Sequence, residues 1–396
     1  METRNPVNWS KLPLDILRAV FELLNFVDFH RAKMVCSNWY SVSKQTVPRK
    51  SGCPWLMLFP DEGDYVLHNP YEDMVYRRRG IDCSGSRFLA SCGKWLLMLD
   101  SRSRLYIIHV FSGNRIDLPP LESLLSNDSV LKRMEDRDKE FEFESTDGSY
   151  YSLLNADEIK GRLWVDEESK EVALVWYFDA PACFVCLYKK GNAHYDLIPI
   201  TYGVPRKLTG LCGLVLQGYR LYILSTRRVV RVIDFSGQQG FEELTRSYTS
   251  PTFSHLGYNC YSSMVVTTAG EFLLVTITIS ESSERAFRIY YKDPNAEPDD
   301  QMPDLVELDS LGDEALLLDL GITVPANHTL GIKPNSIYFT RQDPISSKTN
   351  WNQTAHVVPP SEVDICVFNL STKTLEPFPA PSNMSLNNAR WIFSMT

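Results

Sequence analysis

The sequence contains no apolar run long enough to cross a membrane as a helix. Its longest apolar stretches, such as GEFLLVTITIS at 270–280, are far shorter than the ~20 residues that a membrane-spanning helix requires. The first ten residues, METRNPVNWS, also lack the apolar segment of a secretory leader. We therefore expect no membrane partner and an intracellular location, in the cytoplasm, the nucleus or both.

Positive charge is scarce relative to negative charge. The 396 residues carry 40 lysines and arginines against 49 aspartates and glutamates, which gives a formal net charge of −9 and a pI of about 5.4. No diffuse basic surface is expected, so we predict no nucleic-acid partner. The nine cysteines are an odd number spread over a long chain, which is typical of reduced, buried thiols rather than of a disulfide framework.

Motifs that would indicate catalysis or a cofactor are missing as well. Cys183 and Cys186 have the spacing of a metal-ligand pair, but no second Cys or His pair lies at zinc-finger distance, and residues i and i+3 of a strand point to opposite faces. Gly93-Lys94 lacks the upstream glycine of a phosphate-binding loop, because Phe88 occupies that position. The serine-hydrolase pattern Gly-x-Ser-x-Gly is also absent. We predict no metal, no nucleotide cofactor and no enzymatic activity.

What the sequence does contain is a short helical module at 12–42. Pro13 and Asp15 suit the first turn of a helix, because proline needs no N–H donor there and a negative charge faces the positive end of the helix dipole. A broad apolar stripe follows at Ile16, Leu17, Val20, Phe21, Leu23 and Leu24. Asn25 interrupts this run, and Asp28 is predicted to cap a second helix. The apolar positions of that second helix are Phe29, Ala32, Val35, Cys36 and Trp39.

The two predicted helices carry more apolar surface than about thirty residues can bury by themselves. Either a partner protein covers this surface, or the helices dock on the downstream domain as a structural cap. Spacing alone leaves both possibilities open.

The same stretch resembles the F-box. The matching residues are Leu12, Pro13, Asp15, Ile16, Leu17, Val20, Leu23, Asp28, Phe29, Arg31, Val35, Cys36, Trp39 and Tyr40. Ile16 and Phe29 replace the commoner leucines, which are conservative changes of shape. The resemblance implies that the module binds the adaptor Skp1 and, through it, a cullin-RING ubiquitin ligase.

The resemblance also implies which residues form the Skp1-binding set. They are Leu12, Pro13, Asp15, Ile16, Leu17, Val20, Phe29, Arg31, Val35, Cys36 and Trp39. We expect direct apolar contacts from Leu12, Pro13, Ile16, Leu17, Val35 and Trp39, because large apolar anchors carry most of the energy of an interface. Asp15 and Arg31 are expected to act by capping and pairing.

Beyond position 50 the chain becomes rich in short β-branched and aromatic runs. They lie at 55–59, 94–99, 105–111, 171–178, 220–225, 228–235, 271–279, 286–291, 336–340 and 364–370. These runs are separated by Gly, Asn, Asp and Pro, and they predict a mostly β domain. The remaining length exceeds most single-core domains unless it is built from repeats, and some similar turns recur after 42 and 45 residues, the size of one four-stranded blade. We predict a β-propeller of six or seven blades, with a β-sandwich or irregular two-sheet domain as the alternative.

Three segments carry a second resemblance. They are 84–124, 304–342 and 363–379, and the motifs SLGDEALLL and KPNSIYFT are the most specific parts. They resemble the C-terminal β-propeller of plant F-box proteins of the KIB type. Within these motifs Gly312, Asp313 and Pro334 are interpreted as turn residues.

The predicted organisation is an F-box at 8–48, a linker at 49–54 and a KIB-type propeller at 55–396. The segment 122–157 has mixed charge and weak apolar content, so we predict a loop or short solvated helix inserted between blades, with partner contact as the less favoured role. The acidic stretch 293–304 is predicted to be another linker.

These features predict the substrate-recognition subunit of an Skp1-cullin-F-box ubiquitin ligase, whose propeller captures a protein target for degradation. The alternative is an interaction protein whose propeller inhibits or sequesters a partner, such as a kinase, without ligase assembly. A propeller enzyme is a third possibility, which the missing catalytic motifs disfavour. The target itself is not predicted.

Overall fold

The structure is a computed structural model of the chain. It describes residues 9–46, 55–60, 65–69, 72, 74–77, 83, 85–135, 137–179, 184–199, 211–225, 229–237, 241–248, 260–279, 285–293, 305–328, 331–340, 365–377 and 386–392. The predicted linker at 49–54 and all but the first residue of the acidic stretch 293–304 lie outside these residues. In the described part of the chain no helix is long and apolar enough to span a membrane.

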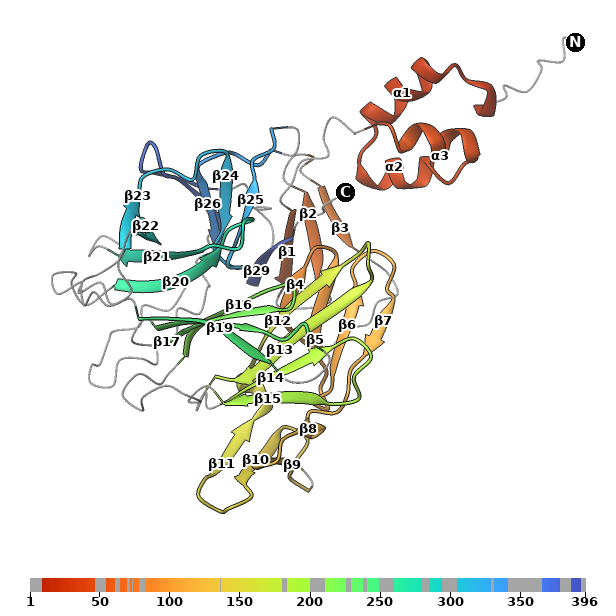
Figure 1. Cartoon of the computed structure of the whole chain (residues 1–396). Coiled ribbons are helices and arrows are strands. Elements are labelled where there is room, and N and C mark those ends of the chain that lie inside the picture. Colours follow the sequence, from red (N-terminus) through yellow and green to blue (C-terminus); the bar gives the residue numbers. More distant parts are fainter. Residues whose placement is uncertain are drawn as a thin grey trace, which may run out of the picture.

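The chain begins with a small helical module (Figure 1). It comprises a short 3-10 helix η1 (Trp9–Lys11) and the α-helices α1 (Leu14–Leu23), α2 (Phe26–Ala32) and α3 (Ser37–Ser43). Strands dominate the remainder, as predicted.

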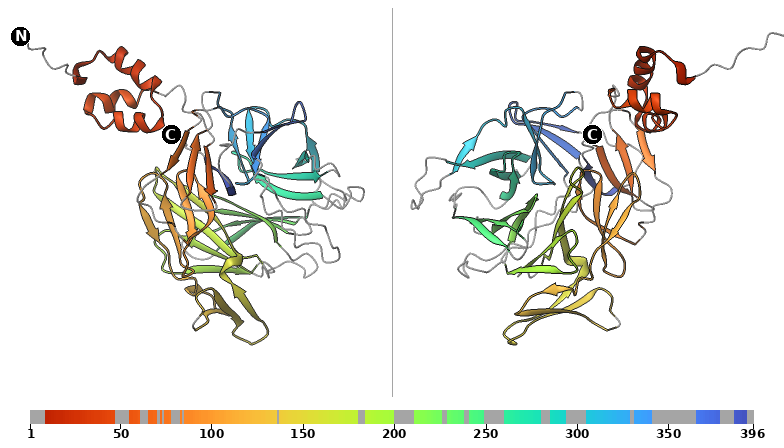
Figure 2. Two further views of the ribbon diagram at one scale, coloured as in Figure 1. Left: turned by 180° about the vertical axis from the view of Figure 1, so that it is seen from behind. Right: turned by 45° about the vertical axis from the view of Figure 1, so that its right-hand side comes forward.

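In the part of the chain that the structure describes, six blades follow one another around a ring (Figures 1 and 2). The first contains β1 (Trp55–Pro60), β2 (Val66–Asn69), β3 (Met74–Arg77) and the C-terminal β29 (Leu386–Ile392). The second contains β4 (Arg87–Cys92), β5 (Trp95–Leu99), β6 (Leu105–His109) and β7 (Arg115–Asp117). The third contains β12 (Ile159–Asp166), β13 (Glu171–Phe178), β14 (Phe184–Lys189), β15 (Tyr195–Pro199) and the short β8 (Leu124–Leu125).

The other half of the ring holds the remaining three blades. The fourth contains β16 (Leu211–Gln217), β17 (Arg220–Ser225), β18 (Val229–Asp234) and β19 (Glu242–Tyr248). The fifth contains β20 (Cys260–Val266), β21 (Phe272–Ile279), β22 (Arg285–Lys292) and β23 (Leu305–Leu308). The sixth contains β24 (Glu314–Leu317), β25 (Ile322–Pro325), β26 (Ser336–Thr340), β27 (Ile365–Asn369) and β28 (Thr374–Pro377). A parallel pairing of Val266 with Ile322 joins the fifth and sixth blades into one continuous sheet.

Apolar cores lie between neighbouring blades, which explains why so many strands are apolar on both faces. In β5, Leu96 and Met98 pack in the cluster shared with the first and sixth blades, whereas Leu97 and Leu99 pack in the cluster shared with the third. Further clusters join the third blade to the fourth, the fourth to the fifth and the fifth to the sixth. Because successive strand residues point to opposite faces, a blade with two neighbours needs apolar residues at nearly every position.

The two ends of the propeller pair with each other and close the ring. Strand β29 runs antiparallel to β1, with Leu56 opposite Trp391 and Trp55 opposite Ile392. The Trp391 side chain is fully buried and meets the ring of Tyr338 in the sixth blade edge-on, with ring centroids 5.5 Å apart. The first blade is therefore completed by the end of the chain, and the propeller prediction is confirmed with six blades.

Two arginines tie adjacent blades through backbone carbonyls. The Nη2 of Arg87 in β4 donates to the carbonyls of Ala156 at 2.7 Å and Ile159 at 2.9 Å. The Nε of Arg162 in β12 donates to the carbonyl of Leu214 in β16 at 2.7 Å. Each bond satisfies a charged donor between blades, where an unpaired one would be costly.

Each of the ten apolar runs predicted as strands contains a strand. The prediction of a loop or short solvated helix at 122–157 was wrong. This segment forms β8 and then a separate three-stranded sheet of β9 (Ser129–Arg133), β10 (Glu140–Ser145) and β11 (Tyr151–Asn155), followed by the 3-10 helix η2 (Ala156–Glu158). The residues of β10 alternate strictly, so Phe141 and Phe143 are buried while Glu142 and Glu144 lie on the other face. The glutamates lowered the average hydrophobicity and concealed a period-two pattern that is typical of a half-buried strand.

Candidate functional site: the exposed face of the helical module

The helical module has a core of its own. Phe21 lies at its centre and meets the rings of Phe29 and Trp39 edge-on, at centroid distances of 5.2 and 5.7 Å. The buried members of the cluster are Leu17, Phe21, Ala32 and Val42, and the half-buried members are Leu12, Leu24, Phe29 and Trp39. Every one of them belongs to the module, so this core is separate from the propeller clusters among the described residues.

Local hydrogen bonds fix where the second helix begins and ends. The Oδ1 of Asn25, not Asp28, caps α2 by accepting the N–H of Asp28 at 2.8 Å, so the predicted cap was wrong. Asp28 instead lies in the first turn, where its carboxylate accepts the Asn25 amide at 2.9 Å. The Asn25 side-chain oxygen thus satisfies one N–H of the helix N-terminus, and the Asp28 carboxylate holds the Asn25 side chain in place.

The predicted second helix is in fact two helices. The N–H groups of Met34 and Val35 bond to carbonyls three residues earlier, which tightens the backbone and ends α2. Cys36 then adopts an extended conformation and α3 begins at Ser37. The break leaves the Val35 side chain 58% exposed at the turn between the two helices.

The outer surface of the module is unusually apolar. Of the thirteen large hydrophobic side chains exposed in the described residues, seven belong to this module: Trp9, Leu14, Ile16, Leu23, Met34, Val35 and Tyr40. Ile16, for example, is 53% exposed on α1. Since about a tenth of the chain holds more than half of these side chains, the surface is suited to a protein partner.

The structure distributes the predicted Skp1-binding residues over three environments. Pro13, Asp15, Ile16, Arg31 and Val35 are exposed, whereas Leu12, Val20, Phe29, Cys36 and Trp39 are half-buried. Leu17 is fully buried and offers no surface, so its expected direct contact is replaced by a supporting role. Trp39 also supports the fold, because its Nε1 donates to the carbonyl of Trp9 at 3.1 Å. For the others the binding role stays a prediction.

Asp15 and Arg31 each form an ion pair, but no side chain caps α1, whose N-cap residue is Pro13. Asp15 pairs with Arg18 at 3.8 Å and Asp28 pairs with Arg31 at 3.4 Å, and the side chains are largely exposed. Exposed pairs of this kind contribute little to stability. Four further exposed residues were not in the predicted Skp1-binding set. Leu14 and Met34 lie outside the F-box pattern, whereas Leu23 and Tyr40 match the pattern but were assigned no contact.

His30 in α2 makes the stability of the module dependent on pH. Burial, followed by the nearby charges of Lys33 and Lys94, lowers the pKa of His30 from 6.5 to about 4. The unfolded chain therefore takes up this proton near pH 6.5 and the folded chain only near pH 4. Stability is complete above that window and is lost as the pH falls through it.

A His30→Gln variant should consequently lose less stability on acidification than the native chain. The measurement is the change in melting temperature between pH 7.5 and pH 4.5 for both proteins, since the other six histidines are common to them. Parallel declines in the two proteins would contradict the proposed burial of His30.

Among the described residues, no group of three or more His, Cys, Asp or Glu side chains could hold a metal ion. Cys186 is fully buried in β14, and burial raises the pKa of its thiol. Its sequence neighbour Cys183 lies outside the described residues. Lys94 follows a tight turn at Gly93 between β4 and β5 and pairs with Glu167 at 3.8 Å.

Comparison with known proteins covers both parts of the chain. A family model for the F-box domain matches residues 9–50, and a family model for the KIB1-4 β-propeller matches residues 41–369. F-box protein At5g25290 of Arabidopsis thaliana is 44% identical over 401 residues, which cover 97% of this chain and 96% of that protein. F-box protein At2g14290 of the same plant is 44% identical and covers 99% of both chains, and F-box protein KIB2 is 32% identical over 99% of this chain and 84% of its own.

Proposed function

Because the chain belongs to the F-box proteins that carry a KIB1-4 β-propeller, we propose that it is the substrate-recognition subunit of an Skp1-cullin-F-box ubiquitin ligase. In this role the helical module binds an Skp1-type adaptor and, through it, a cullin. The propeller captures a protein target, which is then ubiquitinated and degraded. The subunit is not itself catalytic, and it acts in the cytoplasm, the nucleus or both.

One observation carries the proposal: the module folds around its own core and still exposes seven large hydrophobic side chains. A helical cap that served only to protect the propeller would direct those side chains toward the propeller strands. An adaptor-binding module must instead present them to solvent until the partner covers them. The exposed surface therefore favours the receptor over an interaction protein that works through its propeller alone.

An Ile16→Asp variant should weaken binding to a purified Skp1-type adaptor at least thirtyfold, because burying an apolar anchor of this size commonly contributes ~2 kcal/mol and an aspartate would have to be desolvated as well. Binding is measured by calorimetry on the full chain. Ser41→Asp is the matched control, since Ser41 is an exposed residue on α3 and the substitution adds the same charge.

Two outcomes decide the assignment. If Ile16→Asp binds the adaptor as tightly as Ser41→Asp does, α1 does not form the interface. If the native chain binds neither adaptor nor cullin, the ligase function fails, and sequestration of a partner by the propeller becomes the better description.

A further inference from the structure

The sheet β9–β11 carries a clear excess of negative charge. Residues 128–158 contain ten aspartates and glutamates but only four lysines and arginines, a formal net charge of −6 against −9 for the whole chain. In all three views this sheet projects from the end of the propeller that is opposite the helical module (Figures 1 and 2). Its charge suits a basic protein segment and repels nucleic acid.

Apolar contacts fasten one face of the sheet to the propeller. Leu131, Phe141, Phe143 and Leu154 are buried in the same cluster as strands of the second and third blades. Phe143 stacks on Phe184 of β14 with ring centroids 4.2 Å apart. The sheet is thus a fixed extension of the third blade rather than a loose excursion.

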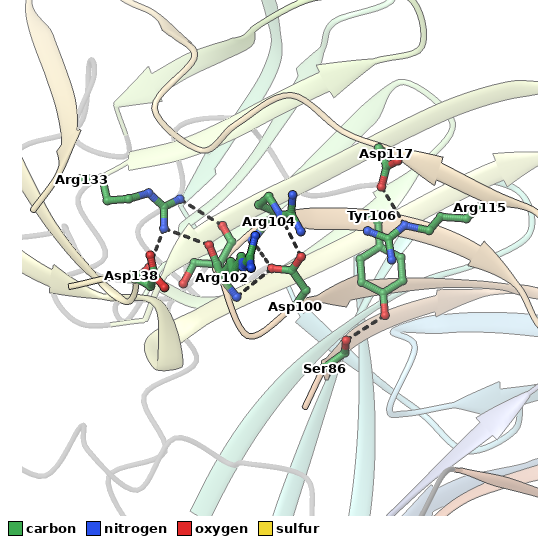
Figure 3. A network of polar contacts seen from close by, with 10 residues as sticks. Ser86, Asp100, Arg102, Arg104, Tyr106, Arg115, Asp117, Arg133 and Asp138 are labelled. Atoms are coloured by element: carbon green, nitrogen blue, oxygen red, sulfur yellow. Dashed lines mark hydrogen bonds and ion pairs between the residues drawn. The ribbon is translucent and has the colours of Figure 1, made fainter. Parts of the chain in front are cut away.

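Arg133, at the end of β9, fixes the sheet a second time (Figure 3). Its Nε bonds to the carboxylate of Glu122 at 2.5 Å, and its Nη1 donates to the carbonyls of Arg102 at 2.9 Å and Asp138 at 2.5 Å. The guanidinium also lies 4.7 Å from the ring centroid of Phe141. A single side chain therefore joins the sheet, the segment that enters it and the β5–β6 turn.

The β5–β6 turn that receives Arg133 is itself well defined. The Oδ1 of Asp100 accepts the N–H groups of Arg102 at 2.9 Å and Arg104 at 2.8 Å, and its Oδ2 accepts the Arg104 Nε at 2.9 Å (Figure 3). Local side-chain bonds of this type hold a turn in one conformation. The Arg102 carbonyl that accepts the Arg133 Nη1 bond therefore lies in a turn with a fixed conformation.

Strand β11 forms an open edge of this sheet. The strand order is β11–β10–β9, and no strand in the described residues pairs with the outer side of β11. The Ser145 N–H bonds to the Tyr150 carbonyl, and the Ala156 N–H bonds to the Lys139 carbonyl. These two bonds show that every second residue of the β11 strand, counted from Tyr150, hydrogen-bonds to β10. The backbone groups of Ser152 and Leu154 must then face β10, and those of Tyr151 and Leu153 face outward.

The same residues expose apolar side chains. Tyr151 is 57% exposed and Leu153 is 59% exposed, and they lie beside Glu142 and Glu144 on the face turned away from the propeller. With Leu125 and Val130, this region holds four of the six large hydrophobic side chains that are exposed outside the helical module among the described residues. Open edges with exposed apolar side chains are normally blocked, since they recruit other strands.

We propose that β11 captures the target protein by pairing with an extended segment of it, one that carries lysine or arginine together with apolar side chains on a single face. The backbone of the segment bonds to the outward groups of Tyr151 and Leu153, its apolar side chains cover theirs, and its basic groups meet the acidic field of the sheet. This inference rests on the receptor function proposed above and names the class of segment that the receptor takes.

The test uses a fluorescein-labelled peptide with the sequence Lys-Thr-Val-Thr-Lys-Thr-Val-Thr-Lys, titrated with the full chain and followed by anisotropy. We expect saturable binding that weakens as salt is added, and at least tenfold weaker binding of the peptide with Glu in place of Lys. A third peptide carries N-methyl groups on alternate amides and should also lose binding, because strand pairing requires those donors. Absence of saturable binding at millimolar peptide, or equal binding of the N-methylated peptide, would overturn the proposal.

Two surface variants locate the site. Leu153→Arg should weaken peptide binding at least tenfold. The control Val130→Arg makes the same change on the same face of the sheet, but on β9, which lies two strands and roughly 10 Å from β11. It should weaken peptide binding less than threefold. Equal losses would mean that overall charge, not the β11 edge, binds the peptide. Both variants should bind the Skp1-type adaptor normally, so failure of the ligase function and failure of this inference give different results.

Discussion

A chain shortened to residues 52–396 is expected to fold, to melt within a few degrees of the full-length protein and to lose all binding to an Skp1-type adaptor. The ring is closed without the helical module, because β29 completes the first blade by pairing with β1. The described module residues form a core of their own and enter no propeller cluster. Val27 of α2 lines one cavity with Trp55 and Tyr65 of the first blade, so removing the module opens this cavity but takes no residue out of a propeller cluster. Differential scanning calorimetry and an adaptor pull-down provide the two measurements.

The same shortened chain should still bind its target. In cells it would compete with the full-length receptor and stabilise the target, because capture would no longer lead to ubiquitination. The opposite expectation comes from a capping role for the helices, in which their removal exposes apolar surface and lowers stability. An insoluble product, or a melting temperature far below that of the full chain with no adaptor in either sample, would establish the capping role.

Disruption of β29 should produce the largest loss of stability. Trp391 is fully buried, and replacing a buried tryptophan with alanine typically costs about 3–5 kcal/mol of unfolding free energy. Deleting residues 384–396 goes further, since it leaves an edge of β1 unpaired and separates the sixth blade from the first. We expect this deletion to prevent folding or to cause aggregation.

Urea unfolding of Trp391→Ala measures the effect. The matched control deletes only residues 393–396, which follow β29, and should leave the unfolding midpoint nearly unchanged. A loss below about 1 kcal/mol for Trp391→Ala would show that the ring is held mainly by its other blade interfaces.

The sequence identified the module and most strands because their signals are local. The F-box pattern depends on spacings within one stretch of about thirty residues, and the apolar runs are long enough to mark β13, β17 and β26 at their observed bounds. The resemblance to F-box proteins with a KIB-type propeller is confirmed by the matches to both family models.

The helix boundaries show where local signals fail. Asn25 and Asp28 can each cap a helix, and only the backbone geometry selects Asn25. The apolar spacing from Phe29 to Trp39 also fitted one helix, although a tightened turn separates α2 from α3. Spacing also does not tell which apolar residues face solvent, because Leu17 is buried in the module core while Ile16 and Val35 are exposed.

By itself, the sequence determined the β-rich class, the helical module and its pattern of apolar residues, since these depend on the chemistry of neighbouring positions. Only the tertiary structure decided that there are six blades, that β29 closes the ring and that the acidic segment forms a sheet with an open edge at β11. Strand β29, with the sequence LNNARWI, has its apolar residues interrupted by two asparagines and an arginine, so it forms no continuous apolar run, and it acquires its role by pairing with β1, more than 320 residues earlier in the chain. Pairing over such a separation is determined by the packing of the whole ring, which no local pattern records.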